Sequence, residues 1–568
     1  MVQLKRAAVN APTIALSGVR SLAHDPVMFG MQVTRRFAGL RSVLDDLTGR
    51  GESRAATLLH LWSAGEQDAL TEQLQRDAAS VEGLGVVGAE IATAAGHPDL
   101  VVDDVRLRPI ARARAAWMLG DVETAFAMVP YRSRYAKTLV AERAMMTPGM
   151  RLSVGIGDAS ACGDTVLHVL TNSLPHTQSG YTIRSHNVLL AQRQAGLGVE
   201  AVTRPGYPLV TGSIDAQAAD VVEGISYARV LPAILASQPD RRLQQHARAI
   251  VRIGAGARLL HTTTNYANAI AVQAAAGVLG IPWAYEVRGM QEQTWIATLH
   301  SAEARERAVR SERYRLIRAR EAQLASASDV VFTLSEGMRQ DLISRGVDGE
   351  SVHVMPNGIP AARLEQPCVL PSDARADLGL PRDGFWVGAV SSLVGYEGFD
   401  TLIDAVKRIR ASGTDVRLLL VGDGVERPAL VQQAADLGEA AVLPGRVDAA
   451  QAQRYLSALD VVVVPRRDLE VTRSVAPLKP IEALAAGKPL LVSDLPPLTE
   501  TIGDELVTAG CAVAPSDAGA LADALTRLSG DESLRARLGE LGRARAAKRT
   551  WEHAGERYAE HYARLTGG

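Results

Sequence analysis

The stretch Val471–Asp494, VTRSVAPLKPIEALAAGKPLLVSD, decides the fold of the second half of this chain. It predicts a proline-containing loop and then a short helix from near Pro480 to Gly487, because a first helical turn tolerates proline and glycine often follows a helix end. The apolar run Leu490–Val492 predicts a buried strand. Glu482 is the acid of the first helical turn, and a loop of backbone N–H groups with one carboxylate beside a helix start suits a phosphorylated sugar carrier. The alternative is an ordinary strand–helix–strand unit with a solvated glutamate.

Length and composition indicate a multidomain α/β protein. The 568 residues are too many for one core and suggest three or four domains of about 150 residues. The formal net charge of −2 argues against broad nucleic-acid affinity. Apolar runs fall short of the roughly 20 residues that span a bilayer, and the first residues do not read as a secretory signal, so we expect a cytoplasmic protein. Three widely spaced cysteines predict neither a disulfide framework nor structural zinc.

Residues 1–160 are expected to form a helical N-terminal extension. Three segments, around Gly65, Gly96 and Gly120, each place a glycine before a polar turn and another helix. This favours helical hairpins of the tetratricopeptide type, and a helical bundle that caps the next domain is the alternative. Basic residues cluster in the first 41 positions, so this region could touch the inner face of a membrane or a protein partner, unless they form a solvated helical face.

From about residue 163 strands and helices alternate, which predicts parallel sheets wrapped by helices. A charged amphipathic stretch, 301–326, is expected to be an exposed helix within the first set of strands. A second alternating set follows, and two doubly wound units bind ligands outside the carboxyl ends of their strands. The predicted strands of the first set are 166–171, 199–203, 257–263, 282–289 and 329–335. The expected domains are 161–360 and 361–545, both Rossmann-like, with 546–568 as a helix that crosses back to the first.

Motifs in both units resemble glycosyltransferase family 4, retaining enzymes of the GT-B fold, over about residues 163–566. They include SGYTIRSHN around Gly180, VGDGVERPAL, LPGRV and PLKPIEALAAGKPLLVSD, in the order that the family shows. The PRR and PLKP motifs indicate a subgroup of that family. The resemblance implies an α/β GT-B fold with two Rossmann-like domains facing a cleft. It also implies a nucleotide diphosphate sugar as co-substrate on the C-terminal domain, an acceptor on the N-terminal domain, and neither a catalytic metal nor another cofactor.

The function implied is retaining, metal-independent transfer of a sugar from a nucleotide diphosphate sugar, expected to be UDP-linked. The acceptor would be a glycan or a lipid-linked molecule in envelope or exported polysaccharide synthesis. Two alternatives stay open. One is a nucleotide-sugar epimerase of similar two-domain fold, and the other is a non-catalytic scaffold that binds nucleotide sugar and recruits partners.

The resemblance assigns the donor-site residues one by one. Glu482 is expected to bind the ribose, whereas Ser474 stands where many relatives carry a second acid, with Glu470 as a possible substitute. Serines and Glu397 replace the Arg…Lys pair with which relatives grip the diphosphate, so nearby cations are expected to take that role. The expected donor-binding residues are Gly180, Arg466, Pro477, Leu478, Lys479 and Glu482.

The first domain departs from the family pattern at YEVRG, where several relatives place a histidine near the reacting sugar. Arg288 is closest to that position, and Glu286 lies on the same face of the strand. The two residues either contact substrate or form an ion pair with each other. His186 and His176 are the alternatives for the acceptor site. The expected catalytic residues are Arg288, Glu286 and His186.

Overall fold

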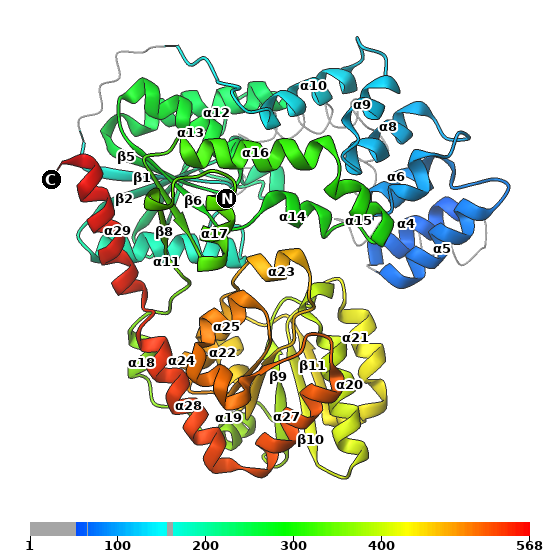
Figure 1. The fold of residues 1–568 in the computed structure, drawn as a ribbon, viewed down its shortest axis with the longest axis vertical. Helices are drawn as coiled ribbons and strands as arrows, with labels where there is room; N and C mark the ends of the chain where they lie inside the picture. The colour runs from blue at the N-terminus through cyan, green and yellow to red at the C-terminus, as the bar shows by residue number, and fades with distance from the viewer. Residues whose placement is uncertain (1–52, 65, 156–162, 568) are drawn as a thin grey trace. The chain divides into compact units, whose positions relative to one another are not determined.

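The computed structural model describes residues 53–64, 66–155 and 163–567, and the basic cluster expected in the first 41 positions lies outside them. The chain divides into two units, each with its own sheet (Figure 1). Unit 1 comprises the described residues up to Thr333 together with 339–354 and 555–567. Unit 2 comprises 334–338 and 355–554.

The region before the first strand is helical, as the sequence predicts. Helix α4 packs on α5 and α6, and α8 packs on α7 and α9, so neighbouring helices bury each other's apolar faces. The helices are α4 (Arg54–Ala64), α5 (Gln67–Ala79), α6 (Gly85–Ala94), α7 (Asp99–Val102), α8 (Pro109–Met118), α9 (Val122–Ala127) and α10 (Arg134–Met146).

This helical region shares a hydrophobic core with three later helices of unit 1, α14 (Gln291–Ile296), α15 (Ala302–Val309) and α16 (Glu312–Ser326) (Figure 1). Two of the glycines singled out in the sequence dock there, because the Gly96 carbonyl accepts from His300 N–H and the Gly120 carbonyl from Arg313 N–H. The expectation of one exposed helix over 301–326 is wrong. Two helices form, and α16 buries Ile317 and Leu324 within unit 1.

The sheet of unit 1 has eight strands in the order β3-β4-β2-β1-β5-β6-β7-β8, all parallel except the β3–β4 pair. The five strands predicted from the sequence all form, and β3, β4 and β8 are additional. The strands are β1 (Thr165–Leu170), β2 (Gly198–Thr203), β3 (Ala219–Val222), β4 (Ile225–Arg229), β5 (Ala257–Thr263), β6 (Trp283–Val287), β7 (Val330–Thr333) and β8 (Val352–Val354). The remaining helices include α11 (Gly180–Gln194), α12 (Pro239–Ile253), α13 (Tyr266–Leu279), α17 (Glu336–Ser344) and α29 (Trp551–Thr566).

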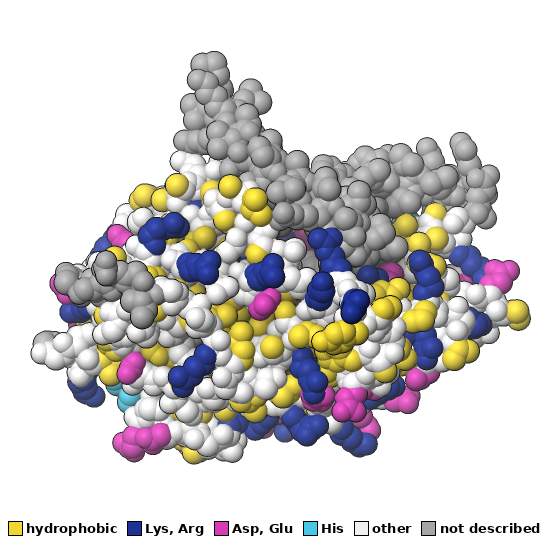
Figure 2. Space-filling model, turned by 90° about the horizontal axis from the view of Figure 1, so that it is seen from above, with side chains coloured by type: hydrophobic (Ala, Val, Ile, Leu, Met, Phe, Trp, Pro, Cys, Tyr) yellow, Lys and Arg dark blue, Asp and Glu magenta, His cyan; other side chains and the backbone are white. Residues whose placement is uncertain are grey.

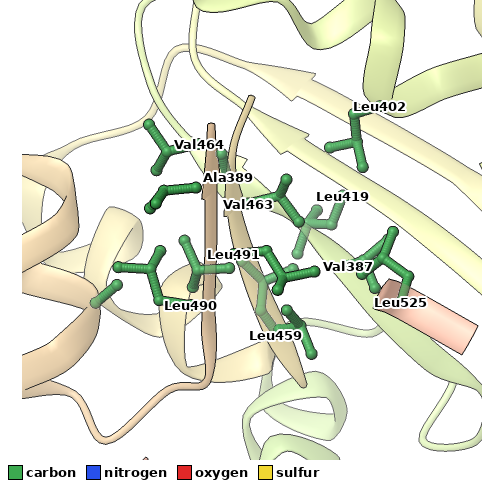
Figure 3. Packing of buried hydrophobic residues seen from close by; sticks show 14 of the residues in the cluster. Val387, Ala389, Leu402, Leu419, Leu459, Val463, Val464, Leu490, Leu491 and Leu525 are labelled. Carbon is green, nitrogen blue, oxygen red and sulfur yellow. The ribbon is translucent and has the colours of Figure 1, made fainter. Parts of the chain in front are cut away.

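Unit 2 contains a six-stranded parallel sheet in the order β11-β10-β9-β12-β13-β14. Its strands are β9 (Phe385–Val390), β10 (Val416–Val421), β11 (Ala441–Gly445), β12 (Val461–Val464), β13 (Leu490–Ser493) and β14 (Ala512–Val513). Around it lie α18 (Ala362–Glu365), α19 (Pro371–Asp377), α20 (Phe399–Ala411), α21 (Arg427–Ala434), α22 (Ala449–Ala458), α25 (Pro496–Ile502), α26 (Asp504–Leu506), α27 (Ala518–Gly530) and α28 (Glu532–Ala547). The side chains of β12 and β13 belong to one buried hydrophobic cluster with Leu402 and Leu525 from the covering helices (Figure 3), and this burial explains the near-continuous apolar runs of these strands.

The segment that opened the sequence analysis folds nearly as predicted. Residues Glu470–Ser474 form the short helix α23 rather than loop, and α24 (Lys479–Ala485) follows. Pro480 lies in the first turn of α24, and Gly487 follows its end with φ at 67°. Strand β13 is buried at every position. The carboxyl end of β12 and the start of α24 therefore frame a well-defined loop.

No helix among the described residues is long and apolar enough to cross a membrane. On the face drawn in Figure 2, Lys and Arg side chains are separated by uncharged and apolar surface instead of forming one continuous field. That distribution agrees with the formal net charge of −2 for the whole sequence.

Candidate functional site

Three charged side chains of unit 2 meet beside the carboxyl ends of its central strands. Glu397 follows β9, Arg466 follows β12, and Lys479 begins α24. We call these three residues the Glu397 cluster. Because ligands of doubly wound sheets bind beyond the carboxyl ends of the strands, this cluster is the candidate donor site of unit 2.

Glu397 is bound by both cations of its cluster. Its Oε1 accepts from Arg466 Nη2 at 3.0 Å, and its Oε2 lies 2.6 Å from Lys479 Nζ. Arg466 Nη1 also donates to the Val475 carbonyl at 3.0 Å. The side chains of Glu397 and Arg466 are only 3% and 7% exposed, whereas that of Lys479 is 20% exposed. Lys479 therefore has the most exposed side chain of the cluster, although its Nζ atom is itself buried.

A glycine makes this arrangement possible. Gly398 has φ at 69°, and a Cβ atom there would lie 2.1 Å from the Pro465 carbonyl oxygen. Only glycine accommodates both the left-handed backbone and this close approach. The loop after β9 can thus lie against the loop after β12, where Arg467 N–H donates to the Tyr396 carbonyl at 3.0 Å. Glu397 is held against Arg466 as a result.

The charges of the cluster perturb one another. Burial alone would raise the pKa of Glu397, but Lys479 and Arg466 lower it below its usual range. Burial lowers the pKa of Lys479 to about 8, although the charge of Glu397 opposes that shift. With one carboxylate and two cations the cluster carries an excess positive charge near neutral pH. An anion would be favoured beside Lys479.

The other predicted donor residues lie in the same loop and helix. Glu482 is exposed in the first turn of α24. The surrounding protein raises the pKa of its carboxyl, while Arg363 and Lys479 offset part of that rise. Pro477 is buried and Leu478 half-buried ahead of the helix. The loop is anchored at the Ala476 carbonyl, which accepts from the Asn357 amide at 3.0 Å.

The position of the missing acid lies at the end of a helix. Ser474 ends α23, and its hydroxyl donates to the Glu470 carbonyl at 3.0 Å. Glu470 is an exposed residue in the first turn of the same helix. Whether Glu470 substitutes for the absent acid stays a prediction.

Unit 1 contains a second glutamate held by cations, which we call the Glu286 cluster. Glu286 Oε1 accepts from Arg184 Nη2 at 2.7 Å and from the Tyr558 hydroxyl at 3.2 Å. Its Oε2 accepts from Arg288 Nη2 at 2.8 Å and lies 3.1 Å from His261 Nε2. Burial would raise the pKa of Glu286, but Arg288 and Arg184 hold it well below its usual range. All five side chains are buried.

These contacts favour the alternative in which Glu286 and Arg288 of the YEVRG motif form an ion pair with each other. Glu286 is fully buried and both of its oxygens are occupied, while Arg288 also donates to the Ser185 hydroxyl at 2.6 Å. The cluster joins β5, β6, α11 and α29, so it forms a structural clamp within unit 1. A catalytic role for Glu286 or Arg288 stays a prediction.

The two histidine alternatives are also engaged. His186 is buried on α11, where Nδ1 lies 2.7 Å from the Tyr227 hydroxyl and Nε2 lies 3.3 Å from Glu223. His176, in the loop after β1, lies 3.1 Å from the Asp220 carboxylate. Both arrangements are typical of structural histidines, and an acceptor-site role for either histidine stays a prediction. His176 is nevertheless half-buried at the carboxyl edge of the sheet.

Gly180 is the first residue of α11 and is exposed. The helix start is secured by Ser179 and Thr182, whose side chains each bond the backbone of the other. The predicted glycine loop and helix are therefore present in unit 1. A contact of Gly180 with the donor stays a prediction.

Sequence reasoning missed several charged and polar residues of unit 1. His261 and Tyr558 belong to the Glu286 cluster, although nothing in their local sequence links them. Arg204 follows β2 at the carboxyl edge of the sheet, a position that could have been singled out from the strand prediction. Among the described residues, no group of three or more His, Cys, Asp or Glu side chains is arranged to hold a metal ion.

Comparisons with known proteins agree with this geometry. A family model described as "Glycosyl transferases group 1" matches residues 384–531, which lie in unit 2. A model described as "Glycosyl transferase 4-like domain" matches residues 179–358, mostly in unit 1. The two matched stretches contain the Glu397 cluster and the Glu286 cluster, except for Tyr558.

Individual relatives are distant. The chain is 29% identical over 262 residues to D-inositol 3-phosphate glycosyltransferase of Xylanimonas cellulosilytica, covering 43% of this chain and 59% of that protein. It is 30% identical over 209 residues to GDP-mannose-dependent monoacylated alpha-(1-6)-phosphatidylinositol monomannoside mannosyltransferase of Corynebacterium glutamicum, covering 36% and 54%. The match thus spans little more than half the length of these curated relatives.

A solved structure shows the same fold over most of the chain. The Anabaena protein Alr3699/HepE, crystallised in complex with UDP-glucose, superposes with a TM-score of 0.51 at 18% identity. The superposition covers 70% of this chain and 99% of that one. The described fold is thus the GT-B fold, with two parallel Rossmann-like sheets, as the sequence predicted.

Proposed function

Because this chain belongs to glycosyltransferase family 4, the group 1 glycosyltransferases of GT-B fold and retaining mechanism, we propose that it transfers a sugar from a nucleotide diphosphate sugar. The acceptor in this proposal is a glycan or a lipid-linked molecule of envelope or exported polysaccharide synthesis. The observation that carries the proposal is the Glu397 cluster, which places the partly exposed side chain of Lys479 in the same helical turn as the exposed Glu482.

Lys479 is the proposed ligand of the donor diphosphate. A phosphate oxygen beside Nζ would add a charge-assisted hydrogen bond to the excess positive charge of the cluster. Its charge would also offset the negative charge that builds on the leaving nucleotide diphosphate, which is where catalysis of this reaction needs stabilisation. Pro477 and Leu478 precede Lys479 and set the course of its backbone.

Arg466 takes a different part in this proposal. Its guanidinium is buried and donates to Glu397 and to the Val475 carbonyl, so it holds Glu397, and Glu397 in turn holds Lys479. Arg466 is thus a positioning residue and not a direct phosphate ligand. Glu482 accepts from the ribose hydroxyls in this arrangement, since its carboxylate is exposed in the same helical turn.

A UDP-linked donor is proposed because the structural neighbour HepE binds UDP-glucose, although the Corynebacterium relative uses GDP-mannose. A thermal-shift panel of UDP-, GDP- and ADP-sugars tests the base. A ligand at about 100 times its dissociation constant stabilises the folded protein by about 2.7 kcal/mol, which raises the melting temperature measurably. If no nucleotide sugar raises the melting temperature of the wild type, and none changes that of Glu482→Ala, the donor site is disproved.

A non-catalytic nucleotide-sugar sensor is the second candidate. It is favoured by Ser474 in place of an acid and by Glu397 in place of a lysine near the phosphates. Incubation of purified protein with donor, with and without acceptor extracts, separates the two functions. Released UDP indicates transfer or hydrolysis, whereas tight donor binding without any UDP release supports the sensor.

A further inference from the structure

Two arginines, Arg204 and Arg242, lie at the carboxyl edge of the unit 1 sheet. Arg204 immediately follows β2, which ends at Thr203. Arg242 lies in the first turns of α12, and this helix leads back to the start of β5. A helix that returns to the amino end of a parallel strand begins at the carboxyl edge, so both arginines lie on the side of the sheet where ligands bind.

The hydrogen bonds of these arginines go only to neutral acceptors. Arg204 donates to the Thr171 carbonyl at 3.2 Å and to the Asn172 side-chain oxygen at 3.2 Å. Arg242 Nε donates to the Ala236 carbonyl at 3.2 Å. Neither guanidinium forms an ion pair with a carboxylate of the described residues. Arg229, on the neighbouring strand, differs because Asp220 binds it at 2.8 Å.

The positive charges also act on each other and on a buried histidine. The surrounding protein lowers the pKa of Arg242, and the charge of Arg204 lowers it further. Burial lowers the pKa of His246 to about 4, again with a contribution from Arg204. His246 is only 1% exposed, and its Nε2 has no hydrogen-bond partner among the described residues. It lies one helical turn after Arg242 on the same face of α12.

Like charges held together without a counter-charge are unfavourable unless a ligand supplies one. Arg204 is half-buried and Arg242 exposed, so a ligand can reach both. We propose that Arg204 and Arg242 bind a phosphate group carried by the acceptor. Two planar guanidinium groups match the oxygens of a phosphate, which supplies the counter-charge that both arginines lack.

The identification of this phosphate as the acceptor's rests on the proposed glycosyltransferase function. The phosphate is either that of a soluble phosphomonoester or that of a phospholipid head group. Both present the same oxygens to Arg204 and Arg242, so the experiment must distinguish them.

The first experiment uses inorganic phosphate as the probe and 31P line broadening as the measurement. It is carried out on the full chain with saturating UDP, so that phosphate does not report on Lys479. We expect Arg242→Gln to weaken phosphate affinity about tenfold or more, because it removes a charge-assisted contact. Arg241→Gln is the matched control, since Arg241 is an exposed arginine of the same helix, and we expect less than a twofold change.

Arg204→Gln is the second variant, and its unfolding profile must match that of the wild type because Arg204 also holds Asn172. Equal effects of Arg241→Gln and Arg242→Gln would indicate general surface charge and overturn the proposal. Unchanged affinity in the Arg204→Gln/Arg242→Gln double variant would overturn it as well.

Two further measurements assign the source of the phosphate. Glycerol 3-phosphate is titrated in solution, and co-sedimentation is measured with phosphatidylcholine vesicles that contain phosphatidylglycerol. If Arg242→Gln loses binding to glycerol 3-phosphate, the acceptor is assigned as a soluble phosphomonoester. If it loses co-sedimentation with the vesicles, the acceptor is assigned as a phospholipid. Retention of both overturns an acceptor role. Failure of the wild type to bind UDP, with phosphate binding still dependent on Arg242, would disprove the proposed function and leave the phosphate site intact.

Discussion

The Glu286 and Glu397 clusters are built from the same chemistry, yet they differ in what surrounds them. Each holds one glutamate between two cations, and both glutamates are buried. Glu286 has two further partners, His261 and Tyr558, and none of its cations reaches solvent. In the Glu397 cluster the Lys479 side chain remains 20% exposed. The comparison indicates that the exposure of a cation's side chain, and not the charges in the cluster, separates a structural clamp from a candidate ligand site.

The largest effect is expected from Glu286→Gln. Removal of this charge leaves Arg184 and Arg288 buried without a counter-charge, which should lower the free energy of unfolding by about 3–5 kcal/mol. Urea unfolding followed by tryptophan fluorescence measures this change. Glu306→Gln is the control, because its side chain is 71% exposed in a pair with Arg310. The control should change stability by less than about 0.5 kcal/mol, and an equally small effect of Glu286→Gln would contradict the clamp.

The next largest effect is expected from Lys479→Met, and it concerns binding instead of stability. Loss of the Lys479 ammonium group should weaken UDP-sugar affinity by about tenfold or more, since a charge-assisted hydrogen bond contributes roughly 1.5–3 kcal/mol. Calorimetric titration measures the dissociation constant. Arg473→Met removes an exposed cation of the preceding helix and should alter affinity by less than twofold. Similar losses in both variants would mean that the site responds only to overall charge.

A pH dependence follows from the pKa of Lys479, which burial lowers to about 8. The protonated amine binds phosphate, so UDP affinity should fall as the pH rises from about 7 to 9.5, by up to about tenfold per pH unit between the pKa of the free protein and the higher pKa of the complex. Donor phosphate will raise that pKa when bound. Lys479→Arg stays charged throughout this range and should show a flatter profile. Parallel profiles for the wild type and Lys479→Arg would assign the titration to another group.

The same pKa predicts the opposite trend for stability. The folded-state pKa of about 8 lies below the ordinary lysine pKa of 10.5, so the unfolded chain binds more protons between these values. The contribution of Lys479 to the free energy of unfolding should therefore increase as the pH rises through this window. This contribution is measured from urea unfolding of the wild type and Lys479→Met at about pH 7.5 and about pH 9.5. A smaller rise in the variant is expected, and an identical rise would contradict the shifted pKa.

The smallest effect is expected from Tyr558→Phe. This change removes one neutral donor to Glu286 and leaves both of its cations in place. The free energy of unfolding should decrease by about 0.5–1.5 kcal/mol, the usual net contribution of a hydrogen bond. Urea unfolding again measures the change. A loss as large as that of Glu286→Gln would show that Tyr558, and not the ion pairs, carries the stability of the clamp.

The strand pattern of this chain could be predicted because buried parallel strands leave a local signal. The apolar runs of β5 and β13 are continuous, and Pro480 and Gly487 mark the helix between β12 and β13. The edge strand β3 and its neighbour β4 lack that signal, because partly exposed strands mix polar and apolar residues. The burial of α16 was likewise hidden, because Glu312 pairs with Arg143 of α10 and Glu321 accepts from the Tyr285 hydroxyl of β6, partners that no local pattern identifies.

The candidate site also has a part that the sequence predicts and a part that it does not. Lys479 and Glu482 could be named from the sequence, because their motif is a single continuous segment with a helix start inside it. That Glu397 binds Lys479 and Arg466 could not, since the three residues come from loops joined only by the order of strands in the sheet. Sequence by itself thus determined the family, the alternation of strands and helices, and the donor loop. Only the tertiary structure decided which charges are neutralised by long-range partners and which remain for a ligand, because burial and pairing depend on distances that no local pattern encodes.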